Sequence, residues 1–140
     1  MLQTVTEQAC AKINLTLEIL GKRPDGYHEL RTVFQTISLA DTLEVAFTPA
    51  PETAVEVTGA CDIPDNLVVK AARRLLDATG TTGRVEVRLE KKIPMGAGLG
   101  GGSSDAAAML LALPVLAGCR VAPEELMRLA AELGSDVPFF

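Results

Sequence analysis

Residues 94–104 carry the clearest chemical signal in the sequence and read Pro-Met-Gly-Ala-Gly-Leu-Gly-Gly-Gly-Ser-Ser. Five glycines within seven residues cost conformational entropy on ordering, which is explained if the backbone must approach a ligand closely. The segment follows an alternating stretch and precedes a helical one, so its N–H groups and the helix dipole would converge on one anion. We therefore predict a phosphate site, in which Ser103 and Ser104 could cap the helix, donate to phosphate oxygens or bind Mg²⁺.

Two well-known phosphate loops do not describe this segment. A Walker loop needs a lysine directly after the glycines, and Ser103 stands there instead. Gly96, Gly98 and Gly101 do satisfy the dinucleotide pattern G-x-G-x-x-G, but no second parallel strand ending in an acidic residue follows the helix. The remaining structural alternative is a flexible hairpin with a serine cap.

Other residues that could do chemistry are scattered along the chain. Lys12 and Asn14 share the polar face of an alternating stretch, and Asp136 lies close to the last residue. Taken alone, each fits an ordinary role as a solvated or capping side chain. Lys91 or Lys92, just before the glycines, could screen phosphates or be solvated, and the sequence does not choose between them.

Composition excludes several classes of function. The chain has 140 residues, 48% of them apolar, and a formal charge of −5, which argues against broad binding to nucleic acid or to an anionic membrane. No stretch approaches the roughly 20 apolar residues of a membrane span, and no signal peptide is evident. A single histidine without a ligand cluster argues against zinc. Three separated cysteines, at positions 10, 61 and 119, predict reduced, mostly buried thiols and a cytoplasmic location.

The elements that would position these residues follow from periodicity. We predict strands over residues 11–20, 30–39, 42–48, 54–58 and 84–91, with a turn at residues 23–26. Ile13, Leu15, Leu17 and Ile19 should form the buried face of the first strand. The fold class is therefore α+β, a mainly antiparallel sheet packed with helices in one domain spanning residues 1–140.

Three helices are expected among these strands. The first is capped by Asp65 or Asn66 and stops near Gly80. The second begins near Asp105 and must be kinked or ended by Pro114, and the third starts at Pro123. The apolar stretch at residues 137–140 is interpreted as an interrupted strand, because a natural terminus usually frays into solvent.

The glycine segment closely resembles the nucleotide loop of the GHMP kinases, small-molecule kinases named for galactose, homoserine, mevalonate and phosphomevalonate. Four further segments resemble one branch of that family: residues 11–15, 23–30, 65–67 and 134–138. That branch uses ATP and Mg²⁺ to phosphorylate the 2-hydroxyl of a methylerythritol joined to cytidine diphosphate, in the non-mevalonate isoprenoid pathway. The resemblance implies the N-terminal, ATP-binding domain of such a kinase, a fold that also resembles a ribosomal-protein domain.

The resemblance assigns roles that the residues alone do not reveal. It implies that Lys12 and Asp136 are catalytic and that Asn14 contacts the substrate polyol. It further implies that Tyr27 stacks on cytosine and that His28 forms a hydrogen bond to it. For ATP, the implied residues are Asn66 at the adenine and the whole loop, namely Pro94, Met95, Gly96, Ala97, Gly98, Leu99, Gly100, Gly101, Gly102, Ser103 and Ser104, with Ser104 as a possible metal ligand.

The chain departs from this pattern mainly in length. The family has a C-terminal half, with a second glycine-rich motif and another aromatic for the cytosine, that these 140 residues lack. We therefore expect little or no activity from this chain alone, and a need for that half or for self-association through the C-terminal end. Two alternatives stay open: a non-catalytic nucleotide-binding half-domain that pairs by strand addition, and a GHMP kinase for another small alcohol.

Overall fold

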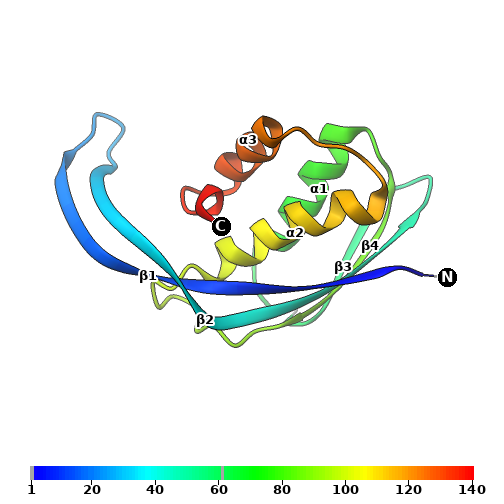
Figure 1. Cartoon of the computed structure of the whole chain (residues 1–140). Helices are drawn as coiled ribbons and strands as arrows, with labels where there is room; N and C mark the ends of the chain where they lie inside the picture. The colour runs from blue at the N-terminus through cyan, green and yellow to red at the C-terminus, as the bar shows by residue number, and fades with distance from the viewer. Residues whose placement is uncertain (1, 61) are drawn as a thin grey trace.

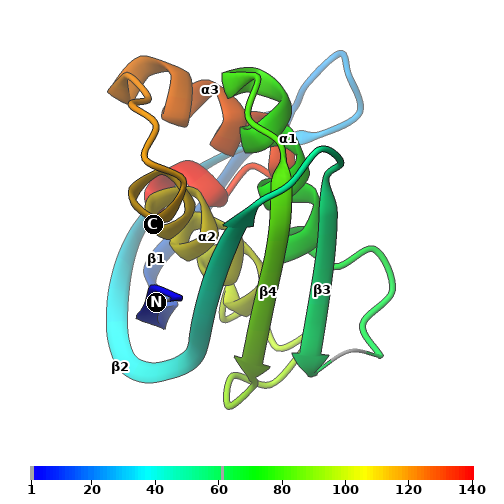
Figure 2. The ribbon, with the colours of Figure 1, turned by 90° about the vertical axis from the view of Figure 1, so that its right-hand side faces the viewer.

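A computed structural model describes residues 2–60 and 62–140. Its four-stranded sheet has the order β1-β2-β4-β3, and the helices cover one face of it (Figures 1 and 2). The elements in chain order are β1 (Thr4–Lys22), β2 (His28–Pro49), β3 (Ala54–Gly59), α1 (Leu67–Thr79), β4 (Gly83–Glu90), α2 (Gly101–Ala117), α3 (Pro123–Leu133) and the short 3₁₀ helix η1 (Val137–Phe139).

The sheet is mixed but mainly antiparallel, so the predicted fold class is confirmed. β1 pairs with β2 and β2 pairs with β4 in antiparallel fashion, whereas β3 runs parallel to β4. The parallel pair is joined through α1, which forms a βαβ unit, because parallel neighbours need a crossover. Two strands predicted over residues 30–39 and 42–48 are one continuous strand, β2.

The two ends of the helix α1 were predicted from local sequence signals, and the structure shows the contacts behind them. The Asn66 side chain accepts a hydrogen bond from the Val68 backbone N–H at 3.0 Å, which satisfies one free donor of the first turn. Gly80 ends the helix in the left-handed conformation at φ 65°. The buried face of α1, which includes Ala71 and Leu75, packs on the sheet beside α2.

The helix α2 differs from its prediction at both ends. It begins at Gly101 rather than near Asp105, because Gly100 in the left-handed conformation serves as the N-cap. Pro114 lies inside the helix, which continues to Ala117. A proline so close to the end removes one backbone hydrogen bond of the last turns, and tertiary packing of the buried helix retains the rest.

Residues 137–140 form no strand, which corrects the prediction for this segment. Val137–Phe139 is a 3₁₀ helix, and Val137 is buried in the core. The Phe139 ring contacts the Phe34 ring of β2 edge-on, with 4.8 Å between the ring centroids. The apolar composition reflects this packing rather than a sheet position.

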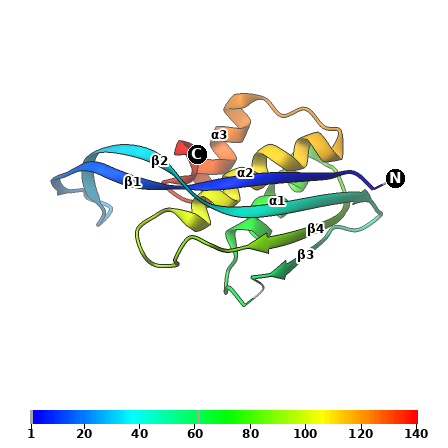
Figure 3. The same cartoon turned by 60° about the horizontal axis from the view of Figure 1, so that its bottom comes forward.

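The hairpin of β1 and β2 extends beyond the helices as a curved arm, which we define as residues 13–36 (Figures 1 and 3). The prediction that its alternating apolar face is buried is wrong. Leu15 and Leu17 are each 58% exposed and Ile19 is 64% exposed, whereas Lys12, expected on the wet face, is 6% exposed. Periodicity reveals a two-faced strand but not which face another element covers.

Two smaller predictions concern the cysteines and the membrane. Cys10 and Cys119 are free thiols, half-buried rather than buried, and Cys61 lies outside the described residues. No helix in residues 2–60 and 62–140 has both the length and the apolar character needed to cross a membrane.

The exposed arm predicts unequal costs for matched truncations. We expect Leu17→Ala to lower the free energy of unfolding by less than about 0.5 kcal/mol, because its side chain contacts solvent. Leu43→Ala, in the same sheet but fully buried, should cost about 2–5 kcal/mol. Urea denaturation followed by circular dichroism measures both. Equal losses at the two positions would show that the face of the arm is covered in this chain.

Candidate functional site

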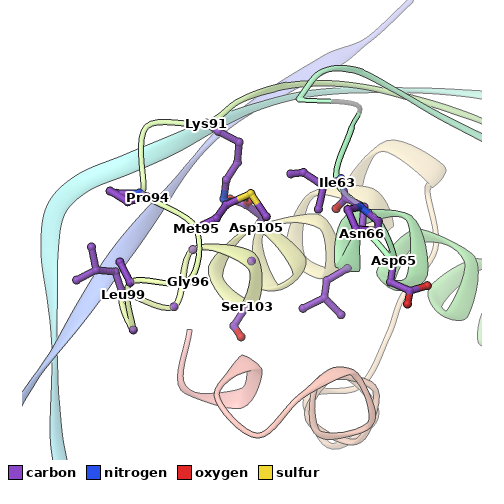
Figure 4. Close-up of a pocket in the computed structure, with 17 residues that line it drawn as sticks. Ile63, Asp65, Asn66, Lys91, Pro94, Met95, Gly96, Leu99, Ser103 and Asp105 are labelled. Carbon is purple, nitrogen blue, oxygen red and sulfur yellow. Dashed lines mark hydrogen bonds and ion pairs between the residues drawn. The ribbon is translucent and has the colours of Figure 1, made fainter.

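A cavity of about 350 Å³ lies between the glycine segment and the start of α1 (Figure 4). Its wall includes Asn66 and every residue from Pro94 to Ser103, together with Lys91 and Asp105. On the opposite side it is lined by the residues from Ile63 to Leu67. The structure thus brings together, around one space, all the residues that the sequence suggested for a nucleotide except Ser104.

Ser103 and Ser104 take different positions at the start of α2. Ser103 lines the cavity, as Figure 4 shows. Ser104 is 3% exposed and borders a separate hollow beside Cys10 and Phe140. Successive helical residues point about 100° apart, so only one of two adjacent serines can face a given ligand.

Two glycines explain why the loop excludes side chains. Gly100 has φ +71°, and a Cβ built there would lie 3.0 Å from the Phe140 ring and 3.1 Å from Cγ of Lys12. A Cβ at Gly101 would lie 3.1 Å from Nζ of Lys91. The loop is therefore packed closely against Phe140 and Lys12 at Gly100 and against Ile93 and Lys91 at Gly101, so a side chain at either position would force these neighbours to shift.

A buried charge cluster lies beneath the loop. The Lys91 ammonium contacts Asp41 Oδ2 at 2.5 Å and Asp105 Oδ2 at 2.9 Å. Asp41 is fully buried and its other oxygen accepts hydrogen bonds from the backbone N–H groups of Lys92, at 2.7 Å, and Ile93, at 2.9 Å. These contacts join β2, the end of β4, the entry to the glycine loop and the first turn of α2 at one point.

The pKa values of the two carboxyls move in opposite directions. Burial, together with the interaction with Asp41, raises the pKa of Asp105 to about 7 despite the nearby ammonium. Burial also acts to raise the pKa of Asp41, but hydrogen bonds from Asp105, Ile93, Lys91 and Lys92 hold it below its ordinary value. With Asp105 protonated, Lys91, Asp41 and Asp105 together carry no net charge, and with Asp105 ionised they carry one negative charge.

The structure shows which of the two lysines before the glycine segment faces the cavity, a point that the sequence left open. The Lys91 side chain is 14% exposed and lines the cavity, whereas Lys92 is 60% exposed and pairs with Glu90. Sequence reasoning missed Asp41 and Asp105 as site residues. The available signal was weak: Asp41 stands between two apolar stretches, and Asp105 follows two serines at an expected helix start.

Lys12 approaches the loop from β1. Its backbone N–H donates to the Leu99 carbonyl at 2.9 Å, so the strand is tied directly to the glycine segment. Its ammonium donates to Asn14 Oδ1 at 2.8 Å and lies 4.6 Å from the centre of the Phe34 ring. The expectation that Lys12 and Asn14 share a face agrees with this geometry.

Asp136 lies in the same region without touching Lys12. It precedes η1, is half-buried, and its carbonyl accepts from the Phe139 N–H at 3.1 Å. Among the described residues its carboxylate forms no ion pair with Lys12. The neighbouring rings of Phe139 and Phe140 pack 5.1 Å apart and connect this segment to the base of the arm.

Tyr27 and His28 are not brought to the cavity. They follow the confirmed turn at the tip of the arm, where the Gly26 N–H donates to the Arg23 carbonyl at 3.0 Å, and Tyr27 is 72% exposed. His28 pairs in register with Lys22, which is separated from Lys12 by roughly 33 Å of strand at about 3.3 Å per residue. The two groups of suggested substrate residues thus occupy opposite ends of the arm.

The raised pKa of Asp105 predicts a pH-dependent stability. Because its folded-state pKa of about 7 lies above the usual 3.8, the folded protein binds this proton more tightly than the unfolded chain does. The contribution is complete below about pH 4 and is lost as the pH rises through about 7. We expect Asp105→Asn, which cannot ionise, to gain at least about 1 kcal/mol relative to wild type between about pH 5 and pH 8.

Guanidinium denaturation at several pH values, in metal-free buffer, measures this difference. Asp77→Asn is the matched control, because Asp77 is an exposed carboxyl on α1. Parallel pH profiles for wild type and Asp105→Asn would contradict the burial of an ionisable Asp105.

Comparison with known proteins gives close matches over most of the chain. It is 69% identical over 134 residues to the 4-diphosphocytidyl-2-C-methyl-D-erythritol kinase of Solibacter usitatus and 52% identical over 138 residues to that of Pelotomaculum thermopropionicum. These matches cover 95% and 96% of this chain but 42% and 48% of the relatives. The chain therefore spans about half the length of the curated relatives it matches.

The fold comparison agrees with the sequence matches. A crystal structure of 4-(cytidine 5'-diphospho)-2C-methyl-D-erythritol kinase superposes with a TM-score of 0.82 at 48% identity, over 97% of this chain and 48% of that one. The family model described as the GHMP kinases N terminal domain matches residues 66–140, more than half of the chain and the part that holds the glycine segment. The chain belongs to the GHMP kinase family, of which it carries the N-terminal domain.

Proposed function

We propose that this chain is the ATP-binding part of a kinase that phosphorylates the 2-hydroxyl of 4-diphosphocytidyl-2-C-methyl-D-erythritol in the non-mevalonate isoprenoid pathway. The observation that carries the proposal is the junction of the glycine cavity with Lys12, through the hydrogen bond from Lys12 to the Leu99 carbonyl. This backbone bond ties the strand that carries Lys12 to the cavity wall, and the proposal needs a buried cation near a phosphate cradle for phosphoryl transfer. The named relatives support the choice of substrate.

ATP would bind with its phosphates against the glycine segment and the first turn of α2. Backbone N–H groups at a helix start favour an anion, and the Lys91 ammonium, paired with Asp41 and Asp105, lines the same cavity wall. Asn66 and the residues around it would border the adenine on the opposite side. The cavity volume of about 350 Å³ is at the lower end of the usual range for ligand pockets.

The chemical step in this proposal uses Lys12 and Asp136. The substrate 2-hydroxyl oxygen attacks the γ-phosphorus, the bond from that phosphorus to the bridging oxygen of ADP breaks, and the hydroxyl proton passes to the Asp136 carboxylate. Because the proton can leave late in a loose transition state, orientation of the hydroxyl matters more than the basicity of the carboxylate. The Lys12 ammonium would stabilise charge on the transferred group.

Magnesium enters the proposal as part of the MgATP substrate. Within residues 2–60 and 62–140 no three acidic, histidine or cysteine side chains lie close enough to hold a metal. Ser104, suggested as a metal ligand, lies outside the cavity wall, and Asp105 Oδ2 is already bound to Lys91. These residues do not fit a resident magnesium site, so we derive no step from one.

Recognition of the substrate would involve the rest of the arm. Asn14 would contact the polyol, and Tyr27 and His28 would hold the cytosine by stacking and hydrogen bonding, as an aromatic face with directional donors can. Because these groups lie at opposite ends of the arm, one substrate that touches both would have to extend along the curved arm. The binding partner that we propose is this small molecule, met in the cytoplasm, and we propose no binding to nucleic acid or to a membrane.

A complete enzyme would also need a second domain. The relatives are about twice as long as the region matched here. In this chain the arm exposes the apolar side chains of Leu15, Leu17 and Ile19. A covering domain would bury these side chains and help bring the substrate residues together. The alternative, a non-catalytic nucleotide-binding half-domain, is favoured by one observation: among the described residues the Lys12 ammonium donates to Asn14 and forms no ion pair with Asp136.

The catalytic assignment predicts a specific loss. In this chain, fused to the C-terminal half of the Solibacter usitatus relative, we expect Asp136→Ala to lower kcat at least about 1,000-fold while the Kd for ATP stays within about threefold. The control is Asp77→Ala, a carboxyl on the surface of α1. ATP binding without turnover in the unmutated fusion would support the non-catalytic alternative, and turnover by Asp136→Ala would remove this residue from the mechanism.

The cytosine assignment predicts a separable effect on binding. Tyr27→Ala should raise KM for the cytidyl substrate about tenfold, the equivalent of one stacking contact, and leave KM for ATP unchanged. Tyr27→Phe retains the ring and should behave as wild type. Steady-state kinetics with each substrate varied in turn give both constants. A larger effect on ATP than on the cytidyl substrate would contradict the assignment.

A further inference from the structure

The ammonium of Lys12 is held by an unusual set of neighbours. Lys12 is 6% exposed, yet among the described residues no carboxylate pairs with it. Its polar partner is the Asn14 amide oxygen at 2.8 Å, and the Phe34 ring lies 4.6 Å away as a cation–π neighbour. The position of this charge therefore depends strongly on which end of the Asn14 amide faces it.

The orientation of that amide is fixed by a chain of hydrogen bonds. The Thr16 carbonyl can only accept, so the Thr32 hydroxyl must donate its one proton to it, at 2.6 Å. Thr32 Oγ1 is then left as an acceptor, which takes the Asn14 Nδ2–H at 2.7 Å. The opposite end of the amide, the oxygen, consequently points at Lys12.

Reversing the Asn14 amide would break two contacts at once. The NH₂ group would face the Lys12 ammonium, donor against donor, and the amide oxygen would face a hydroxyl whose proton is already used. The β1–β2 register shifts between Asn14 and Thr16, beside the carbonyl that starts the chain. Such a bulge re-aims side chains and is common near functional sites.

We propose that Thr32 is a positioning residue, which locks the amide of Asn14 and through it holds the Lys12 ammonium in place beside the Phe34 ring. The importance of Lys12 for turnover rests on the function proposed above, whereas the lock itself rests on the contacts alone. Asn14 keeps one N–H free after binding Thr32. That N–H is available to donate to an acceptor oxygen of the substrate.

Three variants distinguish the effect of the Thr32 hydroxyl on Asn14 from the effect of side-chain packing. Thr32→Val removes the hydroxyl at nearly constant shape, and Thr32→Ser retains it. Thr36→Val is the matched control, because Thr36 pairs with Lys12 in the β1–β2 register and its hydroxyl makes no hydrogen bond among the described residues. Thr32 is half-buried in the arm, so all three variants should fold.

The first readout needs no activity. In this chain labelled with ¹⁵N-lysine, NMR follows the exchange of the Lys12 ammonium protons with water. We expect Thr32→Val to speed this exchange about three- to tenfold, as for the loss of one hydrogen bond, while Thr32→Ser and Thr36→Val stay within about twofold of wild type. Unchanged exchange in Thr32→Val, or an equal change in Thr36→Val, would overturn the lock.

The second readout tests the consequence for catalysis. In the fusion with the relative's C-terminal half, Thr32→Val should lower kcat about three- to tenfold with KM for ATP unchanged, and Thr32→Ser should restore it. An unaltered kcat in Thr32→Val would overturn the positioning role. If the unmutated fusion shows no turnover, the proposed function fails, and the exchange measurement still decides whether Thr32 holds Asn14 and Lys12.

Discussion

The buried contact of Lys91 with Asp41 and Asp105 is the constraint on which the cavity depends. The cluster withdraws two carboxyl groups and one ammonium from water, which is costly without partners, and the partners of Asp41 include the backbone at the entry to the glycine loop. Because Asp41 belongs to β2 and Asp105 to α2, the same contact sets the helix start against the sheet. A glycine-rich loop, flexible by composition, thereby acquires a defined shape.

On the side of Lys12, the loop is held by hydrogen bonds and a cation–π contact rather than by ion pairs. Lys12 is tied to the loop by its backbone and held at its tip by Asn14 and the Phe34 ring, with no counter-charge among the described residues. An ammonium without a paired carboxylate remains available to an incoming anion. The two lysines thus differ: Lys91 pairs with two carboxyl groups beside the cavity, and Lys12 pairs with no carboxylate among the described residues.

The arm is the part of this N-terminal domain that the other elements leave uncovered. Its apolar side chains are exposed and its tip, with Tyr27, lies far along the strand from Lys12. Members of the family that match this chain are about twice as long as the matched region. The cavity beside the glycine segment and the largely uncovered arm are thus two separate regions of this domain.

The sequence by itself determined the fold class, a helix capped by Asp65 or Asn66 and ended near Gly80, the turn at the arm tip and the loop that lines the cavity, because each depends on short-range chemistry. It also carried the family motifs. Only the tertiary structure decided that Lys91 rather than Lys92 faces the cavity, that Ser103 rather than Ser104 does so, and that the apolar face of β1 is exposed. These outcomes depend on which distant element lies against each residue, and periodicity along one strand or helix does not contain that information.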